Sequence, residues 1–572
     1  MSARPAGRVT AGRLLAGVAV VAAVLGVVVV TDPFQEESTP VLVAPALMAE
    51  QQRSVDDAAT DQGALLTTED ERLLRLISAL RPDSAPYVQT VDGTETFVLT
   101  ARGLDYGLAD LVAGGAAEEQ PGGAVLLTKH VLVAPGARLS ISAPGTTLRL
   151  RSDASGIASL VAWKAHLELS GADGRELTLT SWDAERRTAD DDVADGRAYV
   201  RMISGDVEFA HLDARGLGFW AGRTGGVALT GGSSGPVTGA ITDSSFEDGH
   251  YGLFASETDG LEVSGSSFSD NAVDGITLHR QSVETTITDT RVEGNGGNGI
   301  SAEQGSEEIT LTDVDAVGNS EYGVYFSGAP LADGVSAGGA SLRSYGDLTV
   351  TGGHLRDNAK GGVRVVAASD VAIVGTELTD NRDGIVLVDT AAPATVVGTT
   401  VRGDHRFGIS TSGGAATISD NELTGGDTGI RVRAASATVT GNTVEQATEH
   451  GISVVGAAVA SSVVDNTVAG RGPSGLDLHR LAPGVVVEQS GNDLEEWVQD
   501  RDNWVYWSTF IPNHPMLVLW VVILGAPLCL AARARRNRLT VGIPPYQDQM
   551  RRNRPAPRRM DLATPMSSGG HA

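Results

Sequence analysis

The stretch Asp274-Gly-Ile-Thr-Leu-His-Arg280 contains a short frame, a Gly followed by an aliphatic residue, that returns along most of the chain. The frame recurs every 21 to 24 residues, with one longer step of 39. Its copies are Gly252-Leu253, Gly275-Ile276, Gly299-Ile300, Gly323-Val324, Gly362-Val363, Gly384-Ile385, Gly408-Ile409, Gly429-Ile430, Gly451-Ile452 and Gly475-Leu476. A repeat of this length is typical of a solenoid, in which each coil packs only on its neighbours. The single long step predicts an insertion.

The content of each repeat indicates which solenoid this is. One β-type run follows the Gly, as in Gly275–Leu278, and a second lies later in the repeat, as in Thr285–Thr288. The L-x-x-L-x-L spacing of leucine-rich repeats is absent. Stacked Asn side chains can hydrogen-bond from coil to coil, and Asn recurs three or four residues before the Gly, at Asn271, Asn295, Asn319, Asn358 and Asn381. The repeats therefore predict an all-β fold, a parallel β-helix.

Two apolar runs flank the repeats, and Arg residues lie on the outer side of each. Such runs can span a bilayer, and the positive-inside rule would place both termini in the cytoplasm and the β-helix outside. Cleavage of the first run near Ala44-Pro45-Ala46 is the alternative. The predicted order is a cytoplasmic N-terminus (1–13), a signal-anchor (14–31), a linker with a short helix (32–86), irregular capping coils (87–206), a regular β-helix (207–490), a juxtamembrane aromatic segment (491–515), a transmembrane helix (516–532) and a disordered basic tail (533–572).

Within the linker, Thr68-Glu-Asp-Glu71 has the pattern of a helix-capping box. It predicts a helix that begins at Thr68 and ends near Leu80, before Pro82.

Charge and cysteine content exclude some functions. The chain has a net charge of −28 although its two ends, 1–13 and 533–572, are net positive, so the body between them is strongly acidic and does not suit nucleic acid. An acidic body can bind divalent cations such as Ca²⁺, or it can simply keep a long surface soluble. The single Cys529 allows no intrachain disulfide.

The repeat frame also predicts which side chains face outward. Alternate residues of a strand point to opposite faces, and neighbouring coils stack about 4.8 Å apart. If the aliphatic residue after each Gly points inward, the second and fourth residues after the Gly point outward. This register predicts a polar cluster on successive coils, formed by Ser256, His279 and Glu303, with Arg280, Tyr325 and Thr277 beside it.

A His between a hydroxyl group and a carboxylate can act as a general base or acid. Tyr325 would supply the opposing proton, and Arg280 would neutralise a substrate carboxylate. Such a set suits proton abstraction beside a uronate carboxyl group, the step that polysaccharide lyases and C5-epimerases share. The alternative is a polar ladder that only decorates a solvated face.

Later coils add a second set of candidates. The Leu-His-Arg triplet returns at Leu478-His-Arg480, on a C-terminal coil. Three outward residues, Arg364, Arg431 and Arg433, form a candidate strip that binds a polyanionic substrate, and Thr277 in the first cluster is a fourth candidate for substrate binding. The insertion at 328–344 follows the first cluster and is a candidate flap over it.

The run from Tyr251-Gly-Leu-Phe-Ala-Ser256 through Asp274–Ser282 to Glu293-Gly-Asn-Gly-Gly-Asn-Gly-Ile300 resembles the central coils of bacterial mannuronan C5-epimerases and related polysaccharide-lyase-like β-helix proteins. The resemblance implies a right-handed parallel β-helix and an acidic polysaccharide as the substrate class. The family's catalytic Asp-Pro-His-Asp motif does not occur in this chain, and Glu257 occupies the place expected for its catalytic Arg.

Three functions follow as hypotheses. The first is a membrane-anchored β-helix protein that binds or organises a cell-surface carbohydrate, without the need for catalysis. The second is a lyase or C5-epimerase that acts on an acidic polysaccharide through His279. The third is a periplasmic metal-site assembly protein, since β-helices also occur in copper-site assembly; one Cys and scattered His and Met residues disfavour it.

Overall fold

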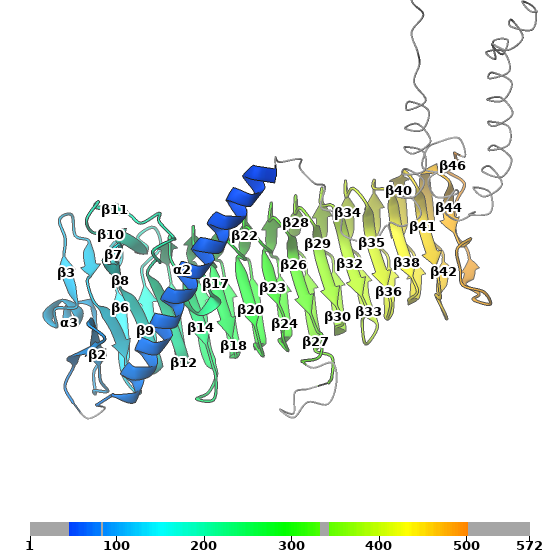
Figure 1. Cartoon of the computed structure of the whole chain (residues 1–572). Helices are drawn as coiled ribbons and strands as arrows, with labels where there is room; N and C mark the ends of the chain where they lie inside the picture. Colours follow the sequence, from blue (N-terminus) through cyan, green and yellow to red (C-terminus); the bar gives the residue numbers. More distant parts are fainter. Residues whose placement is uncertain (1–44, 82–83, 332–341, 501–572) are drawn as a thin grey trace, which may run out of the picture. The chain divides into compact units, whose positions relative to one another are not determined.

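The computed structural model describes residues 45–81, 84–331 and 342–500, all within one compact unit that spans 37–506. Its centre is a stack of coils with three strands each, and successive coils pair in parallel along three ladders (Figure 1). The predicted all-β solenoid is confirmed. The prediction of two β-runs per repeat missed the third strand. That strand is only three residues long in most coils and has one inward side chain, such as Phe268, so alternation cannot reveal it.

The regular coils are built from three series of strands. The first ladder follows the repeated Gly: β14 (Val227–Thr230), β17 (Leu253–Ser256), β20 (Ile276–His279), β23 (Ile300–Ala302), β26 (Tyr322–Ser327), β29 (Gly361–Val366), β32 (Asp383–Val388), β35 (Phe407–Ser412), β38 (Thr428–Arg433), β41 (His450–Val455) and β44 (Ser474–Asp477). The second ladder comprises β15 (Val237–Thr242), β18 (Thr258–Ser264), β21 (Val283–Thr288), β24 (Glu307–Thr312), β27 (Gly346–Thr351), β30 (Ser369–Val374), β33 (Ala394–Val397), β36 (Ala415–Ser419), β39 (Ser436–Thr440), β42 (Ser462–Val464) and β45 (Glu488–Ser490). The third ladder comprises β13 (Leu212–Arg215), β16 (Ser245–Glu247), β19 (Ser267–Ser269), β22 (Arg291–Glu293), β25 (Asp315–Val317), β28 (His354–Arg356), β31 (Glu377–Thr379), β34 (Thr400–Arg402), β37 (Glu422–Thr424), β40 (Thr443–Ala447), β43 (Thr467–Gly472) and β46 (Trp497–Gln499).

The N-terminal coils are less regular, and two long strands, β9 and β12, each run through both the first and the second ladder. The elements here are β1 (Tyr87–Val91), β2 (Thr94–Leu99), α3 (Leu108–Ala113), β3 (Ala117–Glu119), β4 (Val125–Leu127), β5 (His130–Val133), β6 (Arg138–Ser142), β7 (Thr147–Asp153), β8 (Gly156–Ile157), β9 (Ser159–Ser170), β10 (Leu177–Asp183), β11 (Thr188–Ala189), β12 (Tyr199–Ala210) and the 3-10 turn η1 (Gly222–Thr224).

The interior of the solenoid is a continuous apolar core. The aliphatic residue after each repeated Gly points inward, so that Leu253, Ile276, Ile300 and Val324 stack along the first ladder with at most 2% of each exposed. Removing these side chains from water stabilises each coil against the next. The predicted inward register of the frame is confirmed.

Buried Asn side chains stack at one corner of the coils, as predicted. Asn271, Asn295, Asn319, Asn358 and Asn381 form a ladder in which each Nδ2 donates to Oδ1 of the next Asn at 2.9 to 3.0 Å. Asp404 ends the ladder. A second Asn ladder, which the frame did not predict, links Asn421, Asn442, Asn466 and Asn492.

Replacing Asn319 with alanine is expected to destabilise the coils by about 2–4 kcal/mol, because buried donors and acceptors lose their partners. Asn319 is 1% exposed, and its amide donates to Val292 O at 3.2 Å and Asn358 Oδ1 at 2.9 Å. The midpoint of chemical denaturation measures the effect. The exposed neighbour Ser320 gives a control, Ser320→Ala, that should stay within about 0.5 kcal/mol of wild type. Equal midpoints for the two variants would contradict a stabilising role of the ladder.

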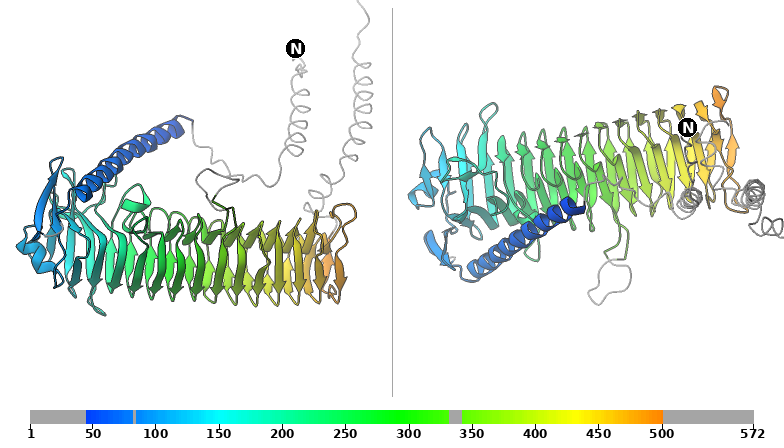
Figure 2. Two further views of the ribbon diagram at one scale, coloured as in Figure 1. Left: turned by 90° about the horizontal axis from the view of Figure 1, so that it is seen from below. Right: turned by 45° about the horizontal axis from the view of Figure 1, so that its top comes forward.

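Helix α2 (Pro45–Ser78) precedes the coils, and its C-terminal part lies against the N-terminal coils (Figure 2). The predicted start at Thr68 is wrong, because the helix is already formed there and Thr68 Oγ1 donates to Ala64 O, one turn back. The capping-box pattern therefore has an intrahelical partner and marks no helix start. The predicted end near Leu80 is close to the observed end at Ser78.

The predicted membrane segments at 14–31 and 516–532 lie outside the described residues, as do the two ends, 1–13 and 533–572, and most of the aromatic segment at 491–515. In the part of the chain that is described, no helix is both long and apolar enough to span a bilayer.

Candidate functional site

The outward face of the first ladder brings the predicted cluster together. Strands β17 and β20 pair so that Ser256 lies beside His279, and β20 and β23 pair so that Thr277 lies beside Ser301. His279 Nδ1 lies 3.3 Å from Glu303 Oε1 on the next coil. The predicted stacking of Ser256, His279 and Glu303 is therefore present.

These side chains line a cavity of about 680 Å³. All five predicted catalytic residues and Thr277 belong to its lining: Ser256, His279, Arg280, Glu303, Tyr325 and Thr277. Aromatic rings also line the cavity. The centre of the Phe254 ring lies 5.5 Å from that of the His279 ring, and the centre of the Tyr251 ring lies 5.6 Å from that of Phe254. The cavity thus combines an imidazole, carboxylates, hydroxyl groups and aromatic rings.

A buried carboxylate, Asp274, supports the floor of the cavity. Its Oδ2 accepts hydrogen bonds from Thr277 Oγ1 at 3.0 Å and Ser301 Oγ at 2.5 Å, and its Oδ1 accepts from Asn298 N at 2.7 Å. Burial raises the pKa of Asp274, although these hydrogen bonds work in the opposite direction. Asp274 therefore fixes the orientation of three polar groups beneath the His279–Glu303 pair.

Two tyrosines face the same space. Burial raises the pKa of Tyr325, and the negative charge of Glu303 adds to this effect. Burial also raises the pKa of Tyr251, with further contributions from Asp274 and Glu303. Both phenols therefore keep their protons at neutral pH and can serve as hydrogen-bond or proton donors.

Three guanidinium groups contribute positive charge to the cavity. Arg280, 59% exposed at its side chain, lies 3.7 Å from Glu257. Arg201 on β12 donates from Nε to Thr230 Oγ1 at 3.0 Å, and burial lowers its pKa. Arg223 of η1 is held by Asp70 of α2, with Nε to Oδ1 at 3.0 Å and Nη2 to Oδ2 at 2.5 Å. Arg guanidinium groups suit the recognition of carboxylates because they can donate two hydrogen bonds at once.

Sequence reasoning missed Arg201, Arg223, Tyr251 and Asp274. Tyr251 and Asp274 lie directly before the repeated Gly, at a position whose direction the frame does not define. Arg201 and Arg223 precede the first regular Gly frame, so only the pairing of β12 with β14 and the position of η1 reveal that they lie near His279.

Of the four predicted substrate-binding residues, only Thr277 lines this cavity; Arg364, Arg431 and Arg433 lie on later coils. Arg364 Nη1 donates to Tyr322 OH at 3.4 Å. The Arg431 guanidinium lies 4.8 Å from the centre of the Phe407 ring. Burial lowers the pKa of Arg431 to about 10, and the charges of Arg433, Arg480 and Arg406 add to the shift. The candidate strip is therefore a separate cationic region of the same face.

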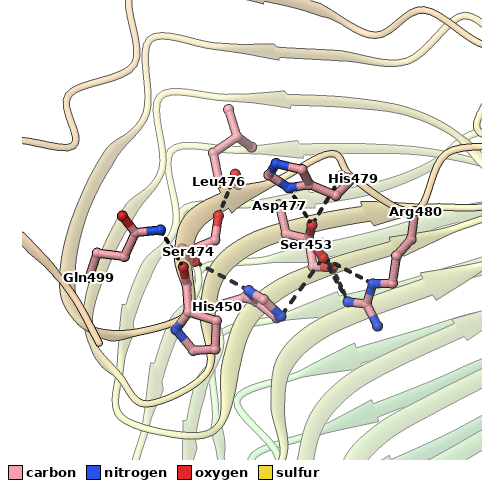
Figure 3. A network of polar contacts seen from close by, with 9 residues as sticks. His450, Ser453, Ser474, Leu476, Asp477, His479, Arg480 and Gln499 are labelled. Carbon is pink, nitrogen blue, oxygen red and sulfur yellow. Dashed lines mark hydrogen bonds and ion pairs between the residues drawn. The ribbon is translucent and has the colours of Figure 1, made fainter. Parts of the chain in front are cut away.

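The second Leu-His-Arg copy has a different setting (Figure 3). Arg480 donates to the buried Asp477 Oδ2 at 2.7 Å from Nη2 and 3.1 Å from Nε. Asp477 also contacts His450, whose Nε2 lies 3.8 Å from Oδ2, and Ser453 Oγ, at 3.3 Å. His479 is 86% exposed at its side chain. This copy forms a local ion-pair network, so the shared triplet does not imply a shared role.

Comparison with solved structures found several similar chains at low sequence identity. The chain is similar to the periplasmic alginate epimerase AlgG, at 14% identity over 73% of this chain and 95% of that chain, with a TM-score of 0.44. It is also similar to the A-module of the Azotobacter vinelandii mannuronan C-5 epimerase AlgE4, at 16% identity over 61% of this chain and 90% of that chain (TM-score 0.36). A third similar structure is the catalytic domain of a GH87 α-1,3-glucanase, at 12% identity over 66% of this chain and 70% of that chain (TM-score 0.40). No curated protein matches the chain in sequence.

Residues 333–472 match the family described as periplasmic copper-binding protein (NosD). The three His residues described in this segment lie at different places: His354 is on β28 of the third ladder, His405 is in the turn between β34 and β35, and His450 is on β41 of the first ladder. Over the described residues, no three His, Cys, Asp or Glu side chains come together as ligands for copper or Ca²⁺. The donor set therefore does not fit a copper centre.

Residues 221–331, which include the whole His279 cluster, match the family described as right handed beta helix region. The strands of this segment pair in parallel from coil to coil, as that description requires. The chain is a right-handed parallel β-helix repeat protein.

Proposed function

We propose that this chain is an extracytoplasmic β-helix protein that binds an acidic polysaccharide in the cavity around His279. One observation carries the proposal: Arg201, Arg223 and Arg280 line the same cavity as Tyr251, Phe254 and Tyr325, on an extended sheet face. Aromatic rings pack against the apolar faces of sugars, while guanidinium groups bind carboxylates.

The test uses a matched pair of ligands. The full-length chain should bind a polyuronate, and carboxyl reduction of the same polymer should weaken binding by about 10²-fold or more, because charge-assisted hydrogen bonds are lost. Isothermal titration with the two polymers measures the difference. Equal affinity for both would contradict recognition of the acidic groups.

The cellular location is part of the proposal. The matching copper-binding family is described as periplasmic, and the apolar runs at 14–31 and 516–532 would anchor the β-helix outside the membrane with both termini in the cytoplasm. A reporter that is active only in the cytoplasm, fused after residue 572, should give signal. Signal only from an extracytoplasmic reporter at that position would contradict this topology.

A lyase or C5-epimerase activity is the second candidate function. The 3.3 Å contact between His279 Nδ1 and Glu303 Oε1 favours it, because a carboxylate orients an imidazole for proton transfer. In this mechanism His279 removes the C5 proton beside a uronate carboxyl group, and Arg280 stabilises the negative charge that develops. Tyr325 then donates a proton to the opposite face of C5 in epimerisation, or to the glycosidic oxygen as the C4–O bond breaks in elimination.

If the wild type forms unsaturated uronate or inverts C5, His279→Ala should lower turnover by about 10²–10⁴-fold while polyuronate affinity changes much less. Ultraviolet absorbance detects elimination, and NMR detects inversion. The control is His354→Ala, since His354 is 60% exposed and lies on the third ladder, away from the cavity. An active wild type with an equally active His279→Ala variant would place the chemistry elsewhere.

A further inference from the structure

One line of outward-facing residues, here called the outward column, runs along the first ladder, and the cavity begins at its residue Arg201. Strand pairing places Leu132, Val161, Arg201, Ala228 and Phe254 in one line across β5, β9, β12, β14 and β17. From Phe254 the same line continues through Thr277, Ser301 and Tyr325. The cavity covers the part of this column from Arg201 to Tyr325.

On the N-terminal side of Arg201, the column is closed. Leu132 and Val161 are at most 1% exposed and belong to a second apolar core, separate from the interior of the solenoid. Leu73 and Leu76 of α2 complete this core together with Tyr199 and Phe219. The helix therefore covers the outward face of the first coils, and a ligand cannot continue along the sheet in that direction.

The η1 turn seals the boundary between the covered and the open face. Gly222 lies so close to the Phe254 ring that a Cβ atom there would meet it at 2.1 Å. The next residue, Arg223, is fixed to Asp70 of α2 by the hydrogen bonds described above. Arg201 and Arg223 thus stand at the closed end of the cavity, beside α2 and η1.

On the C-terminal side, none of the helices and strands that the structure describes covers the face in this way. The residues that follow Tyr325 in the same column include Arg364, Val386 and Arg431, and each is partly exposed. In Figure 1 the strands of these later coils extend well beyond the helix. The binding surface is therefore blocked at one end and open at the other.

We propose that the cavity takes the end of an acidic polysaccharide chain, with the acid group of the terminal sugar at Arg201 and Arg223 and the rest of the polymer running over the later coils. This inference rests on the proposed binding function and adds the mode of binding. A polymer that passed through the site in the middle of its chain would need an exit where α2 and η1 close the face.

Stoichiometry tests the inference on the wild-type full-length chain. Size-fractionated polyuronates of several lengths are saturated with protein, and the number of protein molecules per polymer chain is measured by light scattering. End binding gives one protein per chain at every length. A number that rises in proportion to length would overturn the inference and leave the binding function intact. No binding to polyuronate of any length would instead contradict the proposed function itself.

A variant pair adds a second readout. Arg223→Ala should weaken binding about tenfold or more at every polymer length, because the terminal unit is bound in every complex. The control is Arg356→Ala, since Arg356 is 49% exposed and lies on β28 of the third ladder. An Arg223→Ala effect that disappears for long polymers would overturn the inference, because long polymers would then bind through internal units.

Discussion

Replacing Glu69 with alanine is expected to release helix α2 from the β-helix at a cost of about 3–5 kcal/mol, because the change leaves a buried charge without its partner. Glu69 and Arg72 are 7% and 5% exposed. Glu69 Oε2 accepts from Arg72 Nε at 2.7 Å and Oε1 from Arg72 Nη2 at 2.5 Å. Tyr199 OH also donates to Glu69 Oε1, which links the helix directly to β12.

The protonation state of Glu69 agrees with a strongly held carboxylate. Burial works to raise its pKa, but the hydrogen bonds and charge of Arg72, the charge of His130 and the hydrogen bond from Tyr199 outweigh burial and bring the pKa to about 2. Glu69 is therefore ionised throughout the physiological range. Its removal would leave the buried Arg72 guanidinium without a carboxylate partner, although Thr96 Oγ1, at 2.8 Å, and Ser159 Oγ, at 3.3 Å, still accept hydrogen bonds from it.

Hydrogen exchange measures this loss locally, which matters because a long solenoid need not unfold in one step. Amide protection over residues 61–78 should fall by roughly 10²–10³-fold in Glu69→Ala, while the regular coils keep theirs. The control is Glu71→Ala on the same helix, where the Glu71–Arg75 pair is more than half exposed and should contribute at most about 1 kcal/mol.

A double variant separates charge from packing. In Glu69→Leu with Arg72→Met, no charge remains buried, so much of the lost protection should return. Equal protection in Glu69→Ala and Glu71→Ala would mean that the buried pair does not hold the helix. Release of α2 would also separate Asp70 from Arg223, so the Glu69→Ala variant should bind polyuronate more weakly than Glu71→Ala.

The parts of the structure that follow the repeat could be predicted from the sequence. The period of the Gly frame gives the coils, and the alternation within Ile276–His279 gives the direction of each side chain in that strand. Because the register is fixed by the inward aliphatic residues, the contact between His279 and Glu303 on successive coils followed directly.

The parts outside the repeat could not be predicted in this way. Helix α2 begins at Pro45, in a segment whose mixed Ala and polar composition suggested a linker. Arg201 and Arg223 reach the cavity only through tertiary packing, and Asp70, which holds Arg223, is separated from it by 153 positions in sequence. No periodic pattern encodes such contacts. The closure of the cavity by α2 and η1 could therefore not be predicted from the sequence, whereas the cluster around His279 could.

The first Asn ladder ends at Asp404, whose carboxyl group can ionise, unlike the Asn amides of the other positions. Asp404 is 2% exposed, and its Oδ1 accepts from Asn381 N at 2.8 Å. Its Oδ2 is buried and has no hydrogen-bond partner within the described residues. Burial raises the pKa of Asp404 to about 7, and the charges of Asp383 and Asp380 contribute to the rise.

The sign of the resulting pH dependence follows from proton linkage. The folded chain holds the Asp404 proton up to about pH 7, whereas the unfolded chain releases it near pH 4. Between these values the folded state binds more protons than the unfolded state, so the free energy of unfolding falls as pH rises. Above pH 7 the loss is complete, because the folded chain then buries an ionised carboxylate.

Asp404→Asn should therefore stabilise the protein at pH 8 by about 2–4 kcal/mol and have little effect at pH 4. An amide at this position carries no charge, and its Nδ2 could donate to Leu378 O, as Asn381 Nδ2 donates to Leu355 O one coil earlier at 2.9 Å. The difference between variant and wild-type denaturation midpoints, followed from pH 4 to pH 9, isolates this group from all other titrations. Asp370→Asn, at an exposed position of β30, is the control. If the difference in midpoint between Asp404→Asn and wild type stayed constant with pH, Asp404 would not titrate with a raised pKa. If this difference grows between pH 4 and pH 7, ionisation of Asp404 destabilises the folded chain at neutral pH.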